Sequence, residues 1–178
     1  LPFCFGNINA QVSVTGSVQS DMMIAPQQDE KIGTSEYDNK YFLTNTYADV
    51  QLISKYVDAG TRFEFNQFPM PGFNDAYNKF KGWGIPNLWV KGKFKNVDVT
   101  LGSLYEQFGS GFILRTYEER NLGIDNALSG ARVVWNIHKG IRVKALSGVQ
   151  RNYWEWNKSL ISGADAEFSL DEYVPSMH

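Results

Sequence analysis

The chain of 178 residues is long enough for one domain with a sizeable core, and its net charge of −2 excludes the strongly basic surface typical of nucleic-acid-binding proteins. Aromatic residues make up 15% of the sequence and its 16 glycines are spread along it, which favours strands and turns over helices. No run of about 18 apolar residues occurs, which excludes a transmembrane helix, whereas a transmembrane strand leaves a much weaker trace.

The first ten residues, LPFCFGNINA, predict the end of a secretory signal. An apolar tail is followed by Asn and Gly, and Ile8 and Ala10 stand at the third and first positions before the expected cleavage point. A buried N-terminal strand is the alternative. Cys4 is the only cysteine and would leave with the signal, so the predicted mature domain, residues 11–178, has no disulfide.

From Gln11 onward the sequence alternates with period two, which predicts strands. In each run one face carries apolar or small residues and no charge, while the other face carries polar and charged residues. Eight such runs occur in chain order: residues 12–22, 42–52, 57–66, 87–95, 97–106, 129–136, 141–150 and 160–170.

The connections between these runs alternate in length. Short connections are expected at residues 54–56, 95–96 and 137–140. Long connections are expected at residues 25–41, 67–84, 106–126 and 151–159. Strands that run up and down, with tight turns at one end and long loops at the other, produce this order.

Two architectures fit alternating strands, a soluble β-sandwich and a membrane β-barrel. Sandwich strands average about five or six residues, whereas these runs reach the ~9–11 residues that cross a bilayer at a barrel tilt. An uncharged face suits contact with lipid, and aromatic residues near run ends, such as Tyr56, Trp83 and Trp135, suit interfacial belts. The sequence therefore predicts an all-β, antiparallel up-and-down transmembrane β-barrel, with short periplasmic turns and long outer loops.

In such a barrel the charged faces point into the interior. There they would line a wet lumen and set its preference for ions or solutes. The alternative is that they pair across strands and merely fill a small interior. The candidates for lining or narrowing a pore are Arg62, Glu64, Arg115, Glu118, Glu119, Arg120, Arg132, Arg142 and Lys144.

The connection at residues 106–125 is the candidate constriction element. It breaks on Gly109 and Gly111, continues with the apolar residues 112–114, and then places four charges within six residues. A solvated loop seldom carries three consecutive large apolar residues, and a loop folded into the barrel would bury them against the wall. An external loop with a small hydrophobic contact is the alternative.

The sequence offers no support for an enzyme. His138 stands in a tight turn and His178 at the chain end, and neither accompanies a serine or carboxylate suited to nucleophilic catalysis. No Cys or His spacing suggests zinc, and no glycine-rich signature suggests a nucleotide, so we expect no metal and no cofactor. The runs DNKYF and YWEWN offer aromatic surfaces for stacking sugar.

Three blocks of the sequence carry a resemblance: GSLYEQFGSGFILRTYEERNLGIDNALSGAR, KGIRVKALSGVQRNYWEWN and GADAEFSLDEY. In these blocks the chain resembles a family of uncharacterised porin-like outer-membrane proteins from Bacteroidota. The resemblance implies an outer-membrane barrel and brings no substrate, catalytic residue or cofactor. Members of the family are longer, and the C-terminus DEYVPSMH lacks a final aromatic-ended strand, so we expect the N-terminal part of a larger barrel. A complete eight-stranded barrel, with little lumen, is the alternative.

These observations predict a porin-like protein of the cell outer membrane that allows passage of small solutes. Its expected partners are outer-membrane lipid and those solutes, with no nucleic acid and an undefined oligomeric partner. Two alternatives stay open: a secreted β-sandwich that binds carbohydrate, and a structural or adhesion barrel without transport.

Overall fold

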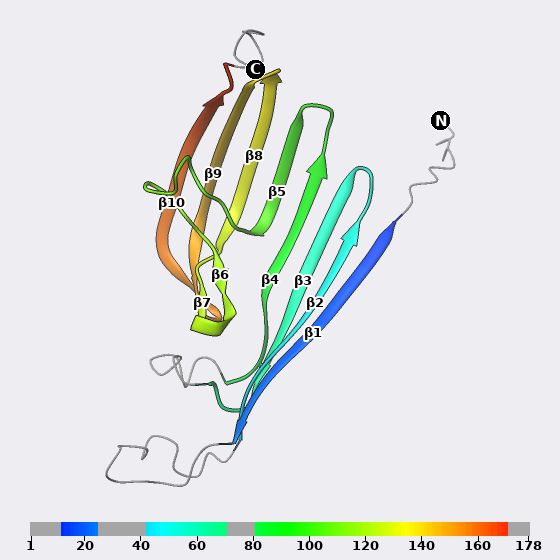
Figure 1. Cartoon of the computed structure of the whole chain (residues 1–178), viewed down its shortest axis with the longest axis vertical. Coiled ribbons are helices and arrows are strands. Elements are labelled where there is room, and N and C mark those ends of the chain that lie inside the picture. The colour runs from blue at the N-terminus through cyan, green and yellow to red at the C-terminus, as the bar shows by residue number, and fades with distance from the viewer. Residues whose placement is uncertain (1–11, 25–41, 71–80, 171–178) are drawn as a thin grey trace.

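The computed structural model describes residues 12–24, 42–70 and 81–170. Eight long strands form one antiparallel sheet in which sequence neighbours are neighbours in space, from β1 at one edge to β10 at the other (Figure 1). The prediction of an all-β, antiparallel, up-and-down fold is confirmed, and each of the eight predicted runs is a strand. The strands are β1 (Ser13–Ile24), β2 (Phe42–Ile53), β3 (Val57–Asn66), β4 (Gly82–Lys93), β5 (Val97–Leu104), β8 (Leu128–His138), β9 (Ile141–Asn152) and β10 (Glu155–Phe168).

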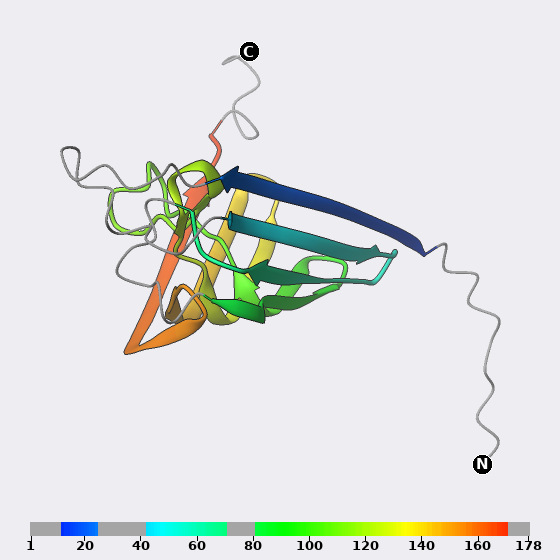
Figure 2. The same cartoon turned by 90° about the horizontal axis from the view of Figure 1, so that it is seen from below.

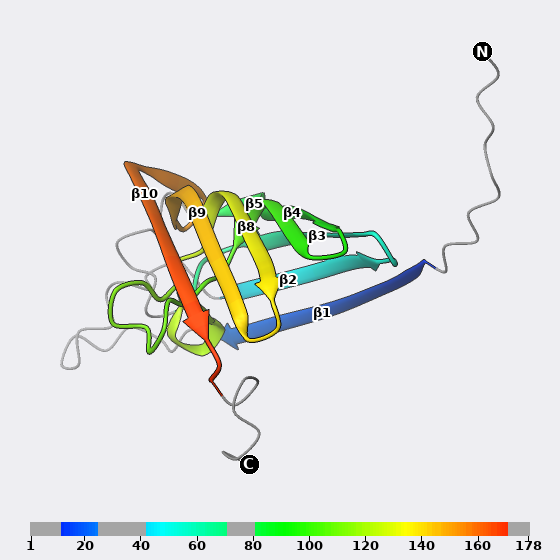
Figure 3. The same ribbon diagram turned by 90° about the horizontal axis from the view of Figure 1, so that it is seen from above.

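The sheet curls into a deep trough, as the views from below and above show (Figures 2 and 3). Within the described residues it is not closed, because β1 pairs only with β2 and β10 pairs only with β9. A second, two-stranded sheet of β6 (Glu118–Glu119) and β7 (Ile124–Asp125) belongs to the connection between β5 and β8.

Three of the predicted short turns are confirmed, at residues 54–56, 94–96 and 139–140. Long connections follow β3 and β5, and the one between β1 and β2 lies outside the described residues. The predicted long connection at residues 151–159 is wrong, because only Tyr153 and Trp154 separate β9 from β10. Tyr153 takes a left-handed φ of 56°, which closes the turn, and a register shift between Trp156 and Leu160 hides the start of β10 from a period-two pattern.

Strand β4 begins five residues before the predicted run, at Gly82 rather than Asn87. The register against β3 shifts between Arg62 and Glu64, and the consecutive residues Pro86 and Asn87 are both buried. A bulge of this kind shifts the alternation by one residue and accommodates a proline, which cannot donate to the ladder.

The sheet buries its polar face and exposes its apolar face. Among the described residues, 11 polar or charged side chains and only eight apolar side chains are buried, and 30 large apolar side chains are exposed. A soluble antiparallel sheet has the opposite arrangement, because burial of apolar surface drives its folding. The uncharged face of the predicted runs is therefore the exposed, convex face.

A small apolar cluster anchors the β5–β8 connection to the concave face. Its buried members are Leu104, Phe108, Leu128 and Leu146, with Leu114 and Ile161 packed against them. Phe108 also lies over β10, where a Cβ added to Gly163 would come within 2.7 Å of the phenyl ring. The connection is thus fixed inside the trough at its first half.

Within the described residues no helix is long and apolar enough to cross a membrane. The predicted signal remnant, residues 1–10, and the segment DEYVPSMH, residues 171–178, lie outside the described residues, as does most of DNKYF.

Candidate functional site

The second half of the β5–β8 connection is a small hairpin, residues 118–125, with a 3₁₀ turn, η3 (Arg120–Leu122), at its tip. Glu119 caps η3 by accepting from the backbone N–H of Asn121, and Gly123 ends it with a left-handed φ of 66°. Glu118 pairs with Asp125 and Glu119 with Ile124 across the hairpin. Capping by Glu119 and the left-handed Gly123 therefore define the conformation of this segment through local interactions, apart from its contacts with the large sheet.

Hairpin 118–125 is bound to β2 and β3 by ion pairs. The Arg62 guanidinium holds Glu118 with two nitrogens, at 2.7 and 2.8 Å, and Asp49 at 2.8 Å. Arg120 joins Asp49 at 2.9 Å and Glu118 at 2.8 Å, and its guanidinium lies 4.7 Å from the centre of the Tyr47 ring. Burial disfavours the charged form of Arg120, but its hydrogen bonds to Glu118 and Asp49 outweigh this and raise its pKa.

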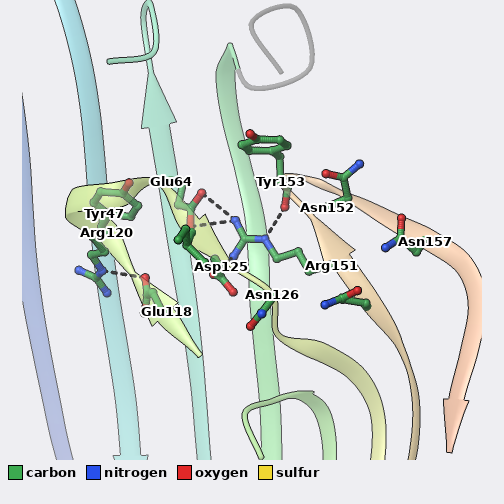
Figure 4. A pocket seen from close by; sticks show the side chains of 13 residues that line it. Tyr47, Glu64, Glu118, Arg120, Asp125, Asn126, Arg151, Asn152, Tyr153 and Asn157 are labelled. Carbon is green, nitrogen blue, oxygen red and sulfur yellow. Dashed lines mark hydrogen bonds and ion pairs between the residues drawn. The ribbon is translucent and has the colours of Figure 1, made fainter. Parts of the chain in front are cut away.

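Strand β9 also contacts the hairpin, through Arg151, as Figure 4 shows. Arg151 on β9 donates to both carboxylate oxygens of Glu64 on β3 at 3.2 Å and also pairs with Asp125. Glu64 is only 1% exposed and accepts a third hydrogen bond, at 2.9 Å, from the Trp154 indole. Full hydrogen bonding is what permits a carboxylate to stay buried.

We call these seven charged residues the central network: Asp49, Arg62, Glu64, Glu118, Arg120, Asp125 and Arg151. Four carboxylates face three guanidinium groups, so the network has one negative charge in excess. Tyr105 adds a hydroxyl that donates to Asp125 at 3.0 Å. Burial and the charges of Asp125 and Glu118 raise the pKa of Tyr105 well above its ordinary value, which keeps this hydroxyl protonated as a donor.

A second group, the lateral network, surrounds Glu106 near β8, β9 and β10. Glu106 pairs with Arg132 at 2.8 Å and with Lys144 at 3.5 Å, and Lys144 also reaches Glu167 at 2.8 Å and Asp165 at 3.3 Å. Burial opposes ionisation of Glu106, but hydrogen bonds from Arg132 and from the backbone of Gln107 lower the pKa of this carboxyl below its ordinary value.

Two cavities open on either side of hairpin 118–125. One, of about 300 Å³, lies towards the end of the long connections and is lined by residues such as Glu64, Asn126 and Arg151. The other, of about 600 Å³, lies towards the short turns and is lined by residues such as Trp89 and Lys91. Glu118 and Arg120 line both, so the hairpin separates the two spaces.

Comparison with known proteins assigns the chain to a family. A model described as a family of unknown function (DUF6029) matches residues 4–177. The chain belongs to the DUF6029 family. The curated proteins contain no match to it.

Four of the predicted candidates in this DUF6029 chain meet in the central network: Arg62, Glu64, Glu118 and Arg120. Arg132 and Lys144 lie in the lateral network instead. Whether any of them lines a pore stays a prediction, because a network of paired charges also suits a filled interior.

The other three candidates, Arg115, Glu119 and Arg142, belong to neither the central network nor the ion pairs around Glu106. Arg115 bridges to Gln107 and places its guanidinium 5.0 Å from the Tyr117 ring. Glu119 serves as the cap of η3. Arg142, whose side chain is 49% exposed, forms an ion pair with Glu167 at 3.9 Å, near the short turn after β8.

The expectation that residues 112–114 would be buried against the wall is wrong for two of the three. Phe112 is 96% exposed and Ile113 is 87% exposed, and only Leu114 packs on the apolar cluster. The tight turn through Gly109 and Gly111, both with positive φ, directs the two side chains away from the sheet.

The nine predicted candidates include neither Asp49, Asp125 and Arg151 of the central network nor Glu106 of the lateral network, nor Trp154, which donates to Glu64. Arg151 and Trp154 fall within the predicted long connection at residues 151–159, where the structure has the end of β9 and a two-residue turn. Glu106 falls where the predicted run 97–106 meets the predicted connection at residues 106–126. Asp125 carries no local signal at all, since its partners Arg62 and Arg151 are distant in sequence. Among the described residues no cluster of His, Cys, Asp and Glu suits a metal ion.

Proposed function

We propose that this protein forms the wall of a porin-like outer-membrane β-barrel and that hairpin 118–125 narrows the passage for small solutes. The observation that supports it is the reversed polarity of the sheet, with charges buried on the concave face and large apolar side chains exposed on the convex face. Exposed apolar surface of this extent is unfavourable in water and favourable in lipid.

The spacing of exposed aromatic residues agrees with a bilayer. Trp83 begins the exposed face of β4 and Phe94 follows its end, at 67% and 66% exposure. Eleven residues at a rise of ~3.3 Å span ~36 Å, and a barrel tilt of ~40° reduces this to ~28 Å across the membrane. The apolar band of outer-membrane barrels is ~25 Å tall, with aromatic residues at both borders.

The hairpin is suited to constrict because ion pairs and other polar contacts, and not the apolar cluster, hold it to the wall. Glu118 and Arg120 bind Asp49 and Arg62 on the wall, whereas the apolar cluster anchors only the earlier half of the connection. Both residues contact the cavities on either side. A solute moving between the cavities would therefore pass these two side chains.

Single-channel conductance in planar bilayers tests the proposal. Deletion of residues 111–121 removes Glu118 and Arg120 and is expected to raise the conductance, because the partition between the cavities is lost. Lys95→Ala is the control, since it removes a charge in the exposed short turn 94–96, outside both cavities, and its conductance should equal that of the parent protein.

Heat-modifiable migration in SDS shows independently whether each variant is folded as a barrel. A protein that is soluble without detergent and shows no such migration would overturn the membrane assignment. Equal conductance of the deletion variant and the parent would overturn the constriction, and a folded barrel without conductance would favour a structural or adhesive role.

A further inference from the structure

A row of glycines crosses the concave face on both sides of Trp89. Neighbouring strands pair Gly60 with Trp89, Trp89 with Gly102, Gly102 with Gly130, and Gly130 with Gly148. Paired residues of adjacent strands point to the same face of a sheet. From β3 to β9 this row therefore has one large side chain, the indole of Trp89.

The indole lies against Gly60. A Cβ added to Gly60 would come within 2.7 Å of its Cε2 and Nε1 atoms and within 2.8 Å of Cζ2. Cε2 is bonded to both other atoms, so these nearly equal distances place the added Cβ above the plane of the ring. Because one side of the indole packs on Gly60, the opposite face is the one available to the 600 Å³ cavity that Trp89 lines.

The surroundings of this aromatic surface are polar but charge-compensated. Ser17, Gln51, Asn87 and Thr100 line the same cavity as neutral hydrogen-bonding residues. The cations that line it are each already paired with a carboxylate: Arg62 with Asp49 at 2.8 Å, Lys91 with Asp98 at 2.8 Å, Arg120 with Asp49 at 2.9 Å, and Arg132 with Glu106 at 2.8 Å. An anionic ligand would have to displace these carboxylates.

We infer that this cavity binds the pyranose ring of a neutral saccharide, stacked on the open face of Trp89. A pyranose has an apolar C–H face that suits an indole and a rim of hydroxyls. Each hydroxyl is one donor and two acceptors, so it bridges both members of an ion pair such as Asp49 and Arg62 without displacing either. The cavity volume of about 600 Å³ lies within the ~300–1,000 Å³ range of small-molecule sites.

The inference rests on the proposed function, since it names the class of solute that the passage would take. It also makes a separate claim, because binding at Trp89 requires no conductance. A flat heterocycle is the other ligand class with apolar faces and a polar edge, and the experiment below tells the two apart.

Isothermal titration calorimetry on the refolded chain, in an amine-oxide detergent without sugar headgroups, tests the inference. The probes are maltose, D-glucuronate as a charged pyranose, sorbitol as an acyclic polyol, and adenosine as a flat heterocycle. Maltose is expected to bind the parent protein, and the three other probes more weakly. Preference for glucuronate or adenosine, or equal binding of sorbitol, would overturn the inference.

Variants place the binding at Trp89. Trp89→Ala should weaken maltose binding at least tenfold, while Trp135→Ala, which removes an exposed indole, should leave it unchanged. Gly60→Ala should also weaken binding, because the added Cβ would lie only 2.7 Å from the indole and would force the ring to move. If Trp89→Ala does not fold, Gly60→Ala decides the question.

Comparison with conductance separates the two proposals. Channels that conduct in bilayers but bind no maltose would overturn the saccharide site and leave the proposed passage standing. Maltose binding that depends on Trp89 in a protein without conductance would support the site and defeat the passage.

Discussion

Removal of one member of the buried pair between Glu64 and Arg151 should cost far more stability than removal of both. Glu64 is 1% exposed and Arg151 5% exposed, so neither charge is solvated once its partner is gone. Breaking a buried pair costs ~3–5 kcal/mol, whereas replacing both members by apolar residues of similar volume is near neutral. Glu64→Leu, Arg151→Met and the double variant form the cycle that measures this.

The two single variants should lose different amounts of free energy of unfolding, because they leave different net charges in the central network. The central network has one excess negative charge. Glu64→Leu leaves three carboxylates and three guanidinium groups, and we expect a loss of ~3 kcal/mol. Arg151→Met leaves four carboxylates with two guanidinium groups, so its loss should approach ~5 kcal/mol. The double variant restores the original excess of one and should lie within ~2 kcal/mol of the parent protein.

Urea unfolding in detergent, followed by tryptophan fluorescence, provides the free energies of unfolding of the parent protein and the three variants. Thr100→Val is a suitable control, since it changes another buried polar residue of the concave face outside this network. Additive losses in the double variant, or a smaller loss for Arg151→Met than for Glu64→Leu, would refute the reasoning from residual charge.

Three further predictions concern other parts of the molecule. The lowered pKa of Glu106 means that its ionised form stabilises the fold above the carboxyl's ordinary pKa of 4.5, and that this contribution is lost as the pH falls through the lower, folded-state value. The urea midpoint of Glu106→Gln should therefore vary less than that of the parent over this acidic range, and equal variation would contradict the prediction. Val133→Arg on the convex face should cost ~2–4 kcal/mol in a lipid environment, whereas a free energy of unfolding close to the parent value would indicate a water-exposed face. Gly123→Ala should destabilise hairpin 118–125 by about 1 kcal/mol because of the left-handed φ at the end of η3, and faster amide hydrogen exchange at Asn121 and Gly123, with unchanged exchange in β9, is the expected result.

Much of the fold could be predicted because its signal is local. A strand places alternate side chains on opposite faces, so the uncharged face of each run is readable from residues two positions apart. The same pattern analysis failed at two places where the strand pairing is interrupted. Near Pro86 in β4 a bulge shifts the alternation by one residue, and after Trp156 in β10 the register against β9 shifts by two residues. Local spacing also identifies four residues of the central network as candidates. Arg62 and Glu64 lie on one face of β3, and Glu118 and Arg120 lie in one hairpin.

Local patterns specify the strands, the turns between most of them, and which face of each strand carries charge. Which charges meet depends on the three-dimensional arrangement of the strands. Arg151 reaches Glu64 from 87 positions away, and Arg62 reaches Asp125 from 63 positions away. These pairings depend on the register between strands and on the curl of the sheet, which bring distant strands around one hairpin. Alternation within a strand carries no information about either, so the inward fold of residues 118–125 could be observed only in three dimensions.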